Sequence, residues 1–378
     1  MTEIRSPDEM DRIAKQCVGD VLPICPKLCM ASCDFLKSCC QTPKELAQAL
    51  RNGQLTQDPG LVYSCNLCGL CKRLCIRGLD VGRMCLELRR QMVEEGTAPL
   101  PSHGQIIEDQ TWISGNFALS MPNPATGECN RVFFPGCSLS GNSPSLVVKT
   151  YDYLREKLPD TGIMLNCCGG PVHLIGDEAG FKRRMAELQS ELDRLGASEI
   201  IVACPECYHT LKDVGGLPVV SIYEIMATHG LPVAAPSGEG TFSLHDSCST
   251  RYEEGIQDSV RSLVTQMGYQ IEELTYSRSM TRCCGMGGMA SYANPKLTNK
   301  VTMRRAREAK RDMLSYCASC RDAFAFVGKP SVHVLDLIFN PDWQKSKRAA
   351  PTSPKAKKEN QGSLKSQFES QQKEASNV

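Results

Sequence analysis

The sequence predicts an α/β fold in which two duplicated cysteine-rich α/β domains follow an N-terminal α-helical domain. The first observation is that one five-cysteine pattern occurs twice after residue 131. The second is that short apolar runs alternate with amphipathic helices over the same region, as in α/β layers with a mainly parallel sheet. The third is that the first 96 residues hold eleven of the 22 cysteines and carry signals for short helices.

These patterns divide the chain into five segments. We expect a helical domain over residues 1–96, a linker over 97–130, cysteine-rich domains over 131–235 and 236–342, and a tail over 343–378. Proline, glycine and asparagine are frequent in the linker. The tail has too few apolar residues to form a core, so we expect it to be disordered and basic. It would be solvated, or would touch an acidic partner or a membrane surface.

Helix signals are clearest at two places in the N-terminal domain. Thr42 is a capping residue, Pro43 suits the first helical position, and Glu45 completes a capping box. A second helix is predicted from Val81 to Glu95, where apolar residues recur on one face. We therefore expect short helices around the N-terminal cysteines.

Apolar runs predict the strands of the two cysteine-rich domains. They span residues 131–134, 162–165 and 199–203 in the first domain and 241–244 and 312–316 in the second. A long amphipathic helix is predicted from Phe181 to Leu195, ending at Gly196. Most of the predicted strands end shortly before a cysteine. Parallel sheets bind ligands outside the carboxyl ends of their strands, so we expect these cysteines to converge.

The cysteine content indicates metal or redox chemistry rather than a disulfide framework. The N-terminus has no apolar stretch of signal-peptide kind, and no run approaches the roughly 18 apolar residues of a membrane span. We therefore expect a cytoplasmic protein, or one held peripherally at a membrane through a partner, whose thiols stay reduced. The formal net charge of +1 provides no general attraction for nucleic acid.

The repeated frame consists of one cysteine, a doublet followed by glycine, and a Cys-x2-Cys pair. Corresponding cysteines are offset by 111 to 116 residues, which indicates a duplication. The candidate ligands and catalytic residues are Cys137, Cys167, Cys168, Cys204 and Cys207 in the first copy and Cys248, Cys283, Cys284, Cys317 and Cys320 in the second. Five soft thiolates per copy favour iron–sulfur chemistry, and zinc is the alternative at one of the two sites.

The N-terminal cysteines predict two cubane 4Fe-4S clusters. Cys65, Cys68, Cys71 and Cys75 have the spacing of bacterial ferredoxins, in which the fourth cysteine ligates a second cluster. We expect Cys65, Cys68 and Cys71 to share one cluster with Cys39 or Cys40. The ligands expected for the other cluster are Cys25, Cys29, Cys33 and Cys75. Its spacing is irregular, so a lost or remodelled site is the alternative.

The frame and its leading blocks, Phe134 to Cys137 and His245 to Cys248, resemble the cysteine-rich (CCG) domain family. That family includes the catalytic subunit of heterodisulfide reductase and iron–sulfur subunits of glycolate and lactate oxidation systems. Residues 42–75 are similar to its ferredoxin-like subunit, so the chain resembles a fusion of the two over about residues 20–340. The resemblance implies a noncubane 4Fe-4S cluster on each five-cysteine frame, with the two clusters facing one another across a disulfide.

We therefore expect an iron–sulfur oxidoreductase subunit that passes electrons from cubane clusters to paired noncubane clusters, where a low-molecular-weight disulfide is reduced. The alternative is a non-catalytic electron-transfer subunit that links a flavoprotein dehydrogenase to a quinone or other acceptor. The chain shows no credible flavin or nicotinamide fingerprint, so a flavoprotein or other redox partner is expected. His173, His209 and His245 lie near frame cysteines, as hydrogen-bonding or surface residues or as proton donors.

Overall fold

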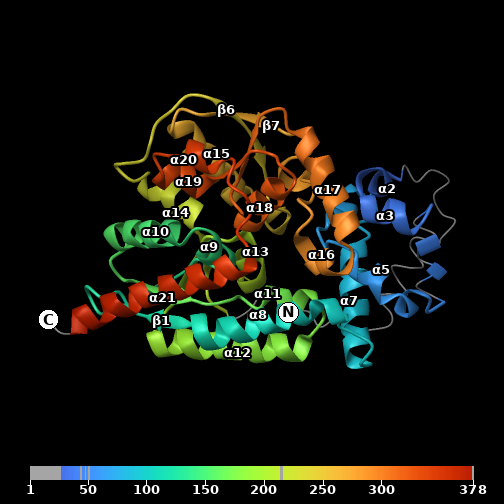
Figure 1. Ribbon diagram of the computed structural model, residues 1–378, viewed down its shortest axis with the longest axis horizontal. Helices are drawn as coiled ribbons and strands as arrows, with labels where there is room; N and C mark the ends of the chain where they lie inside the picture. Colours follow the sequence, from blue (N-terminus) through green and yellow to red (C-terminus); the bar gives the residue numbers. More distant parts are fainter. Residues whose placement is uncertain (1–26, 43–44, 47, 50–51, 213–215, 377–378) are drawn as a thin grey trace.

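The computed structural model of the protein describes residues 27–376 apart from 43–44, 47, 50–51 and 213–215 (Figure 1). Its N-terminal part is helical, as the sequence predicts. The helices there are α2 (Leu28–Ser32), α3 (Asp34–Cys39), α5 (Pro59–Tyr63), α6 (Leu70–Leu74) and α7 (Val81–Glu94). The backbone N–H of Glu45 donates to the Thr42 hydroxyl at 3.3 Å, as expected of a capping residue.

The first cysteine-rich domain contains a five-stranded sheet in the order β1-β3-β2-β4-β5. Its strands are β1 (Leu119–Met121), β2 (Arg131–Phe134), β3 (Thr161–Leu165), β4 (Glu199–Val202) and β5 (Val219–Ser221). Strands β2 to β5 are parallel, and only β1 is antiparallel to its neighbour. The helices are α8 (Gly104–Trp112), α9 (Cys137–Asn142), α10 (Pro144–Lys157), α11 (Gly170–Leu174), α12 (Glu178–Leu195), α13 (Pro205–Leu211) and α14 (Ile222–His229).

The second cysteine-rich domain repeats this arrangement. Its four strands are parallel in the order β7-β6-β8-β9. They are β6 (Thr241–His245), β7 (Gln270–Glu273), β8 (Asp312–Ser315) and β9 (Ser331–His333). Its helices are α15 (Glu254–Gln266), α16 (Ala290–Ala293), α17 (Pro295–Glu308), α18 (Ala318–Phe326), α19 (Val334–Phe339) and α20 (Trp343–Ser346). Because the order matches β3-β2-β4-β5, the duplication in the sequence is also a duplication in the fold, and the predicted α/β class is confirmed.

The segment expected to be a linker is in part a folded element of the first domain. It contains α8 and β1, and β1 pairs with β3 so that Met121 lies opposite Ile163. Phe117 and Met121 are fully buried in the core. The turn-forming residues of this segment therefore flank an edge strand, and the expectation of a plain linker over 97–130 is wrong.

The tail is also ordered, which corrects the expectation of disorder over 343–378. Residues Pro354–Ser376 form the long helix α21, which lies along α9 in Figure 1. Leu364 and Phe368 are buried in the main core, with the Phe368 ring 5.5 Å from that of Tyr151, edge to face. Two apolar residues four positions apart meet on one helix face, so they suffice to dock the helix on an existing core.

The three parts of the chain pack against one another. The main core includes side chains from both cysteine-rich domains and from α21. The N-terminal helices have a separate core, and in Figure 1 they lie beside α16 and α17 of the second domain. Within the described part of the chain, none of the helices has the length and apolar character needed to cross a bilayer.

Candidate metal centres

The first five-thiol site (Cys137, Cys167, Cys168, Cys204 and Cys207) forms at the carboxyl ends of three adjacent strands. Its cysteines follow β2, β3 and β4 within a few residues, as the sequence predicts. Hydrogen bonds connect the thiols in the order Cys137, Cys167, Cys168, Cys207, Cys204. The Sγ atoms of Cys137 and Cys167 are 3.9 Å apart. All five candidate ligands of the first frame therefore meet.

The second five-thiol site (Cys248, Cys283, Cys284, Cys317 and Cys320) has the same connectivity. Its thiols are hydrogen-bonded in the order Cys248, Cys283, Cys284, Cys320, Cys317. The Sγ atoms of Cys284 and Cys320 are 3.2 Å apart. In both copies the doublet joins the leading cysteine to the Cys-x2-Cys pair, so the two frames build equivalent sites.

The glycine after each doublet has a positive φ that other residues rarely adopt. The φ of Gly169 is 79° and that of Gly285 is 101°. A Cβ on Gly285 would overlap the Thr302 hydroxyl, which itself donates to the Cys284 carbonyl at 2.7 Å. The Gly285 N–H lies 3.2 Å from the Cys283 sulfur. Glycine is thus needed both for the turn and for the close approach of the backbone to the thiols.

Neighbouring thiols perturb one another strongly. The pKa of Cys167 is held well below its usual range, chiefly because Cys137 donates a hydrogen bond to it. A hydrogen bond from Cys283 does the same to the pKa of Cys284. The pKa of Cys320 is raised because its thiol donates to Cys284 and because it is buried. In each site, hydrogen bonds from neighbouring thiols therefore stabilise one cysteine as a thiolate.

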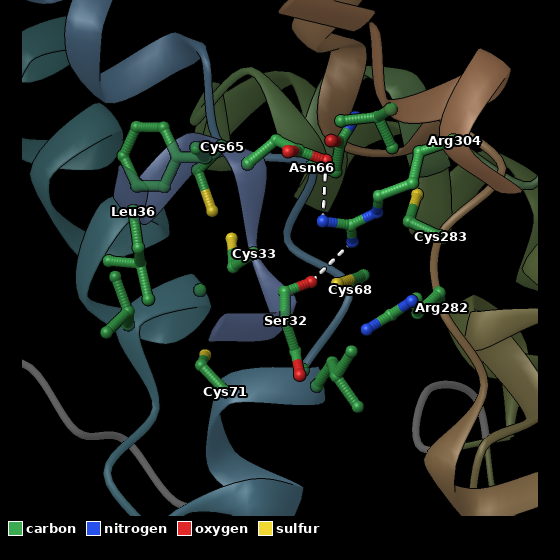
Figure 2. Close-up of a pocket in the computed structure, with 17 residues that line it drawn as sticks. Ser32, Cys33, Leu36, Cys65, Asn66, Cys68, Cys71, Arg282, Cys283 and Arg304 are labelled. Atoms are coloured by element: carbon green, nitrogen blue, oxygen red, sulfur yellow. Dashed lines mark hydrogen bonds and ion pairs between the residues drawn. The ribbon is translucent and has the colours of Figure 1, made fainter. Parts of the chain in front are cut away.

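A third group of thiols lines a cavity between the N-terminal domain and the second cysteine-rich domain. Figure 2 shows Cys33, Cys65, Cys68 and Cys71 around this thiol cavity, with Cys283 of the second domain at its edge. Its empty volume, including the opening to solvent, is about 550 Å³. Burial raises the pKa of Cys33 to about 12. The cavity brings together the first three cysteines of the ferredoxin-type motif, as the sequence predicts.

The fourth thiol in this cavity differs from the expected one. Cys33 lines it, whereas Cys39 and Cys40 do not and instead pair with each other at 3.8 Å. Helix α3 explains the difference, because its six residues carry Cys39 about 9 Å along the axis from Cys33. Cys25, a candidate ligand of the other N-terminal cluster, lies outside the described residues. The grouping of Cys29 and Cys75 on that cluster therefore remains a prediction.

Cys85 belongs to none of the cysteine motifs in the sequence, but the structure places it beside the thiol cavity. Cys85 lies on α7 and is buried, and its thiol is hydrogen-bonded to that of Cys65. The spacing of apolar residues along α7 could have indicated that Cys85 is buried. Only the packing of α7 brings the Cys85 thiol to Cys65. The pKa of Cys65 is raised, first by this hydrogen bond and then by burial.

Buried arginines join the thiol cavity to both cysteine-rich domains. The guanidinium of Arg89 is fully buried and donates to the carbonyls of Cys65, Leu174 and Gly288 at 2.7 to 2.8 Å. Arg251 donates to the Cys68 carbonyl at 2.8 Å. Each cation thereby satisfies carbonyls from separate parts of the chain, so the relative position of the thiol sites is set by directional hydrogen bonds.

The two five-thiol sites approach each other across the boundary between the domains. Ser138, next to Cys137, is hydrogen-bonded to Ser319 at 3.3 Å, and Ser249, next to Cys248, donates to Glu206 at 2.5 Å. The leading cysteine of each copy thus lies against the Cys-x2-Cys helix of the other. Buried Tyr223 lies between them, where burial raises its pKa and the thiols of both domains add to the effect.

The donor sets fit iron–sulfur clusters better than single metal ions. Each five-thiol site offers five sulfur atoms, one more than a tetrahedral zinc ion uses. Burying several thiolates together is costly without a compensating cation, and a metal supplies that charge. The N-terminal domain contributes four thiols to the thiol cavity, which is the ligand number of a cubane cluster. The residues present therefore suit the groups that the sequence predicts.

Comparison with known proteins identifies the repeated unit. Residues 131–212 and 242–325 each match the model of the cysteine-rich domain, CCG. Both copies of the five-cysteine frame are therefore similar to this domain, as the resemblance in the sequence predicts. It is similar to a component of the dihydromethanophenazine:CoB–CoM heterodisulfide reductase of Methanosarcina mazei, at 24% identity over 78% of each protein. The chain is thus heterodisulfide reductase-like in sequence.

Two further relatives differ in their overall length. An EtfAB:quinone oxidoreductase of Syntrophomonas wolfei is 22% identical over 67% of this chain but only 40% of its own length. An uncharacterised iron–sulfur protein of Methanocaldococcus jannaschii is 24% identical over 65% of this chain and 52% of its own length. The relatives are thus iron–sulfur or oxidoreductase proteins in which this unit occurs within larger chains as well.

Proposed function

We propose that the chain is an iron–sulfur oxidoreductase subunit that receives electrons at its N-terminal domain and delivers them to its two cysteine-rich domains. The observation that carries this proposal is the position of Cys283. This residue belongs to the second five-thiol site, lines the thiol cavity and is hydrogen-bonded to Cys68. Clusters held on either side would therefore be separated by little more than their own ligands.

The residues divide among three groups. Cys33, Cys65, Cys68 and Cys71 would hold a cubane 4Fe-4S cluster, and each five-thiol site would hold a noncubane cluster. A second cubane on the remaining N-terminal cysteines completes the proposed cofactor set, and zinc in one five-thiol site is the alternative. When bound, such clusters supply one-electron redox chemistry at potentials set by charge, hydrogen bonds and exposure.

The proposed reaction is reduction of a low-molecular-weight disulfide. Two electrons and two protons cleave the S–S bond and yield two thiols, with the electrons supplied by a flavoprotein or another redox partner. The support is that both five-thiol sites are complete and that each leading cysteine lies against the opposite Cys-x2-Cys helix. A disulfide bound at this boundary would contact both sites. The names of the heterodisulfide reductase relatives agree with this reaction.

A relay without disulfide chemistry is the second candidate, because the serines next to the leading cysteines already contact the opposite domain directly. The Ser138–Ser319 and Ser249–Glu206 hydrogen bonds occupy part of the boundary at which a disulfide would bind. In a relay, electrons would pass from a flavoprotein to a quinone or another acceptor, as the name of the Syntrophomonas relative indicates for that protein. Contact with a membrane-bound acceptor would then be peripheral.

Anaerobically purified protein distinguishes these proposals. Iron and acid-labile sulfide should be present at a level corresponding to about four 4Fe-4S clusters. With a low-potential artificial donor, the chain should convert a small disulfide to two thiols, and Cys284→Ala should abolish this turnover while the cubane signals persist in electron paramagnetic resonance. Zinc as the dominant metal would refute the redox proposal. Reversible cluster reduction without thiol formation across a panel of disulfides would leave the relay.

A further inference from the structure

His245 is a buried residue at the second five-thiol site that is not one of its five cysteines. It is the last residue of β6 and is only 1% exposed. Its ring packs edge to face on Phe324 with centroids 4.9 Å apart, which restricts its orientation. One of its ring nitrogens and the sulfur atoms of Cys284 and Cys320 all lie within 4.8 Å of one another.

The hydrogen bond from Arg305 decides which ring nitrogen carries the proton. The Nε of Arg305 donates to Nδ1 of His245 at 3.1 Å. A guanidinium has only donors, so Nδ1 must accept, and in the neutral ring the proton lies on Nε2. Arg305 cannot turn away easily, because its other nitrogens donate to Glu308 and to the Tyr276 carbonyl at 2.8 and 2.7 Å.

The Nε2 atom then needs an acceptor. It is buried, and among the described residues it has no hydrogen-bond partner, sulfur atoms included. Leaving a buried donor without a partner is costly, so the nearby thiolate sulfur atoms of the loaded site are its natural acceptors. The site therefore contains one N–H group directed to no other polar atom of the described protein.

The first cysteine-rich domain has no histidine at this position, and its side-chain donor to the thiols is Gln110, which is hydrogen-bonded to Cys167. The equivalent position, the last residue of β2, is Phe134, which is buried and apolar. The next positions differ in the same sense, because Pro135 stands where the second copy has Asp246. Asp246 is fully buried and forms an ion pair with Arg261 at 2.9 Å. The two five-thiol sites thus share their cysteines but differ in the polarity of the segment before the leading cysteine.

We infer that His245 is a positioning residue that, once the second five-thiol site is loaded, donates a hydrogen bond from Nε2 to one of its thiolates and makes that centre more easily reduced than it would be without this donor. A donor at a ligating sulfur stabilises the added negative charge of the reduced state, so it raises the reduction potential. The second site is also the one that touches Cys68 of the thiol cavity. The inference rests on the proposed iron–sulfur occupancy, and it names a residue that sets the reduction potential of the second centre.

The test is a redox titration of anaerobic protein followed by electron paramagnetic resonance. A Cys168→Ala background removes a ligand of the first site, so that the second site is read alone. His245→Phe introduces the residue of the first copy, His245→Leu removes the donor with a smaller side chain, and His245→Gln keeps an amide donor. Phe324→Leu is the control, because it changes the packing of the ring without removing the N–H.

We expect His245→Phe and His245→Leu to lower the reduced-to-oxidised ratio of the second centre at least tenfold at a fixed potential. This corresponds to about 59 mV for a one-electron couple. His245→Gln should restore most of the ratio, and Phe324→Leu should leave it within about threefold. An unchanged ratio with full iron content overturns the inference alone. Loss of iron in both donor-free variants overturns it too, because His245 would then be a ligand or structural residue. Absence of iron and sulfide from the unmodified chain refutes the proposed function instead.

Discussion

Substitution of Phe368 by alanine tests whether α21 is an integral part of the fold. The Phe368 side chain is fully buried in the main core and packs on Tyr151 at a ring distance of 5.5 Å. Removing a buried phenylalanine costs about 3–5 kcal/mol, which combines the lost transfer free energy with the cavity that remains. The edge-to-face ring contact contributes about 0.5–1.5 kcal/mol of that loss. We therefore expect Phe368→Ala to destabilise the protein by about 3–5 kcal/mol.

Anaerobic urea unfolding of the cluster-loaded protein measures this loss, and hydrogen exchange locates it. Amides of α21 and of α9 should exchange faster in the variant, because the Nδ2 of Asn360 and the Nε2 of Gln361 on α21 donate to the Gly141 and Cys137 carbonyls at 2.7 and 2.8 Å. Lys373→Ala is the matched control on an exposed position of the same helix, with an expected change within about 0.5 kcal/mol. Equal and small effects of both substitutions would refute docking of α21.

Three further predictions concern the thiol sites and a buried histidine. Gly285→Ala should lower the free energy of unfolding in urea by about 2–5 kcal/mol, because alanine disfavours the positive φ and its Cβ would overlap the Thr302 hydroxyl. Gly328→Ala is the control, because Gly328 has a φ of 75° but open space around it, and it should lower the free energy of unfolding by only about 1–2 kcal/mol. Cys33→Ser should remove one cubane signal in electron paramagnetic resonance. Loss of that signal in Cys39→Ser instead would show that Cys39 is the fourth ligand, as the cysteine spacing predicted. Burial lowers the pKa of His333 to about 3. As pH falls below about 6.5, the His333 imidazole is therefore protonated in the unfolded chain but stays neutral in the folded chain. The free energy of unfolding should drop by about 2 kcal/mol at pH 5 for this reason. His333→Asn should remove this part of the pH dependence, and an unchanged acid profile would contradict it.

The duplicated frame allowed much of the second half to be predicted. The constant offset between corresponding cysteines indicated two equivalent units, and apolar runs before Cys137 and Cys248 indicated strands. Strands β1, β5, β7 and β9 were not predicted. They are short, and β7 carries two glutamates among its four residues, so none has the apolar run on which the prediction depended. Their place is set by pairing with longer neighbours.

The sequence by itself determined the α/β class, the two five-thiol sites and the ferredoxin-type spacing of Cys65, Cys68 and Cys71, because each depends on residue spacing along a regular element or a short loop. Only the tertiary structure decided that Cys33 lines their cavity and that Cys283 belongs to two thiol groups. It also decided that α21 docks on the core. These features depend on which segments meet across distances of tens to hundreds of residues, and packing and buried hydrogen bonds set that choice rather than local propensity.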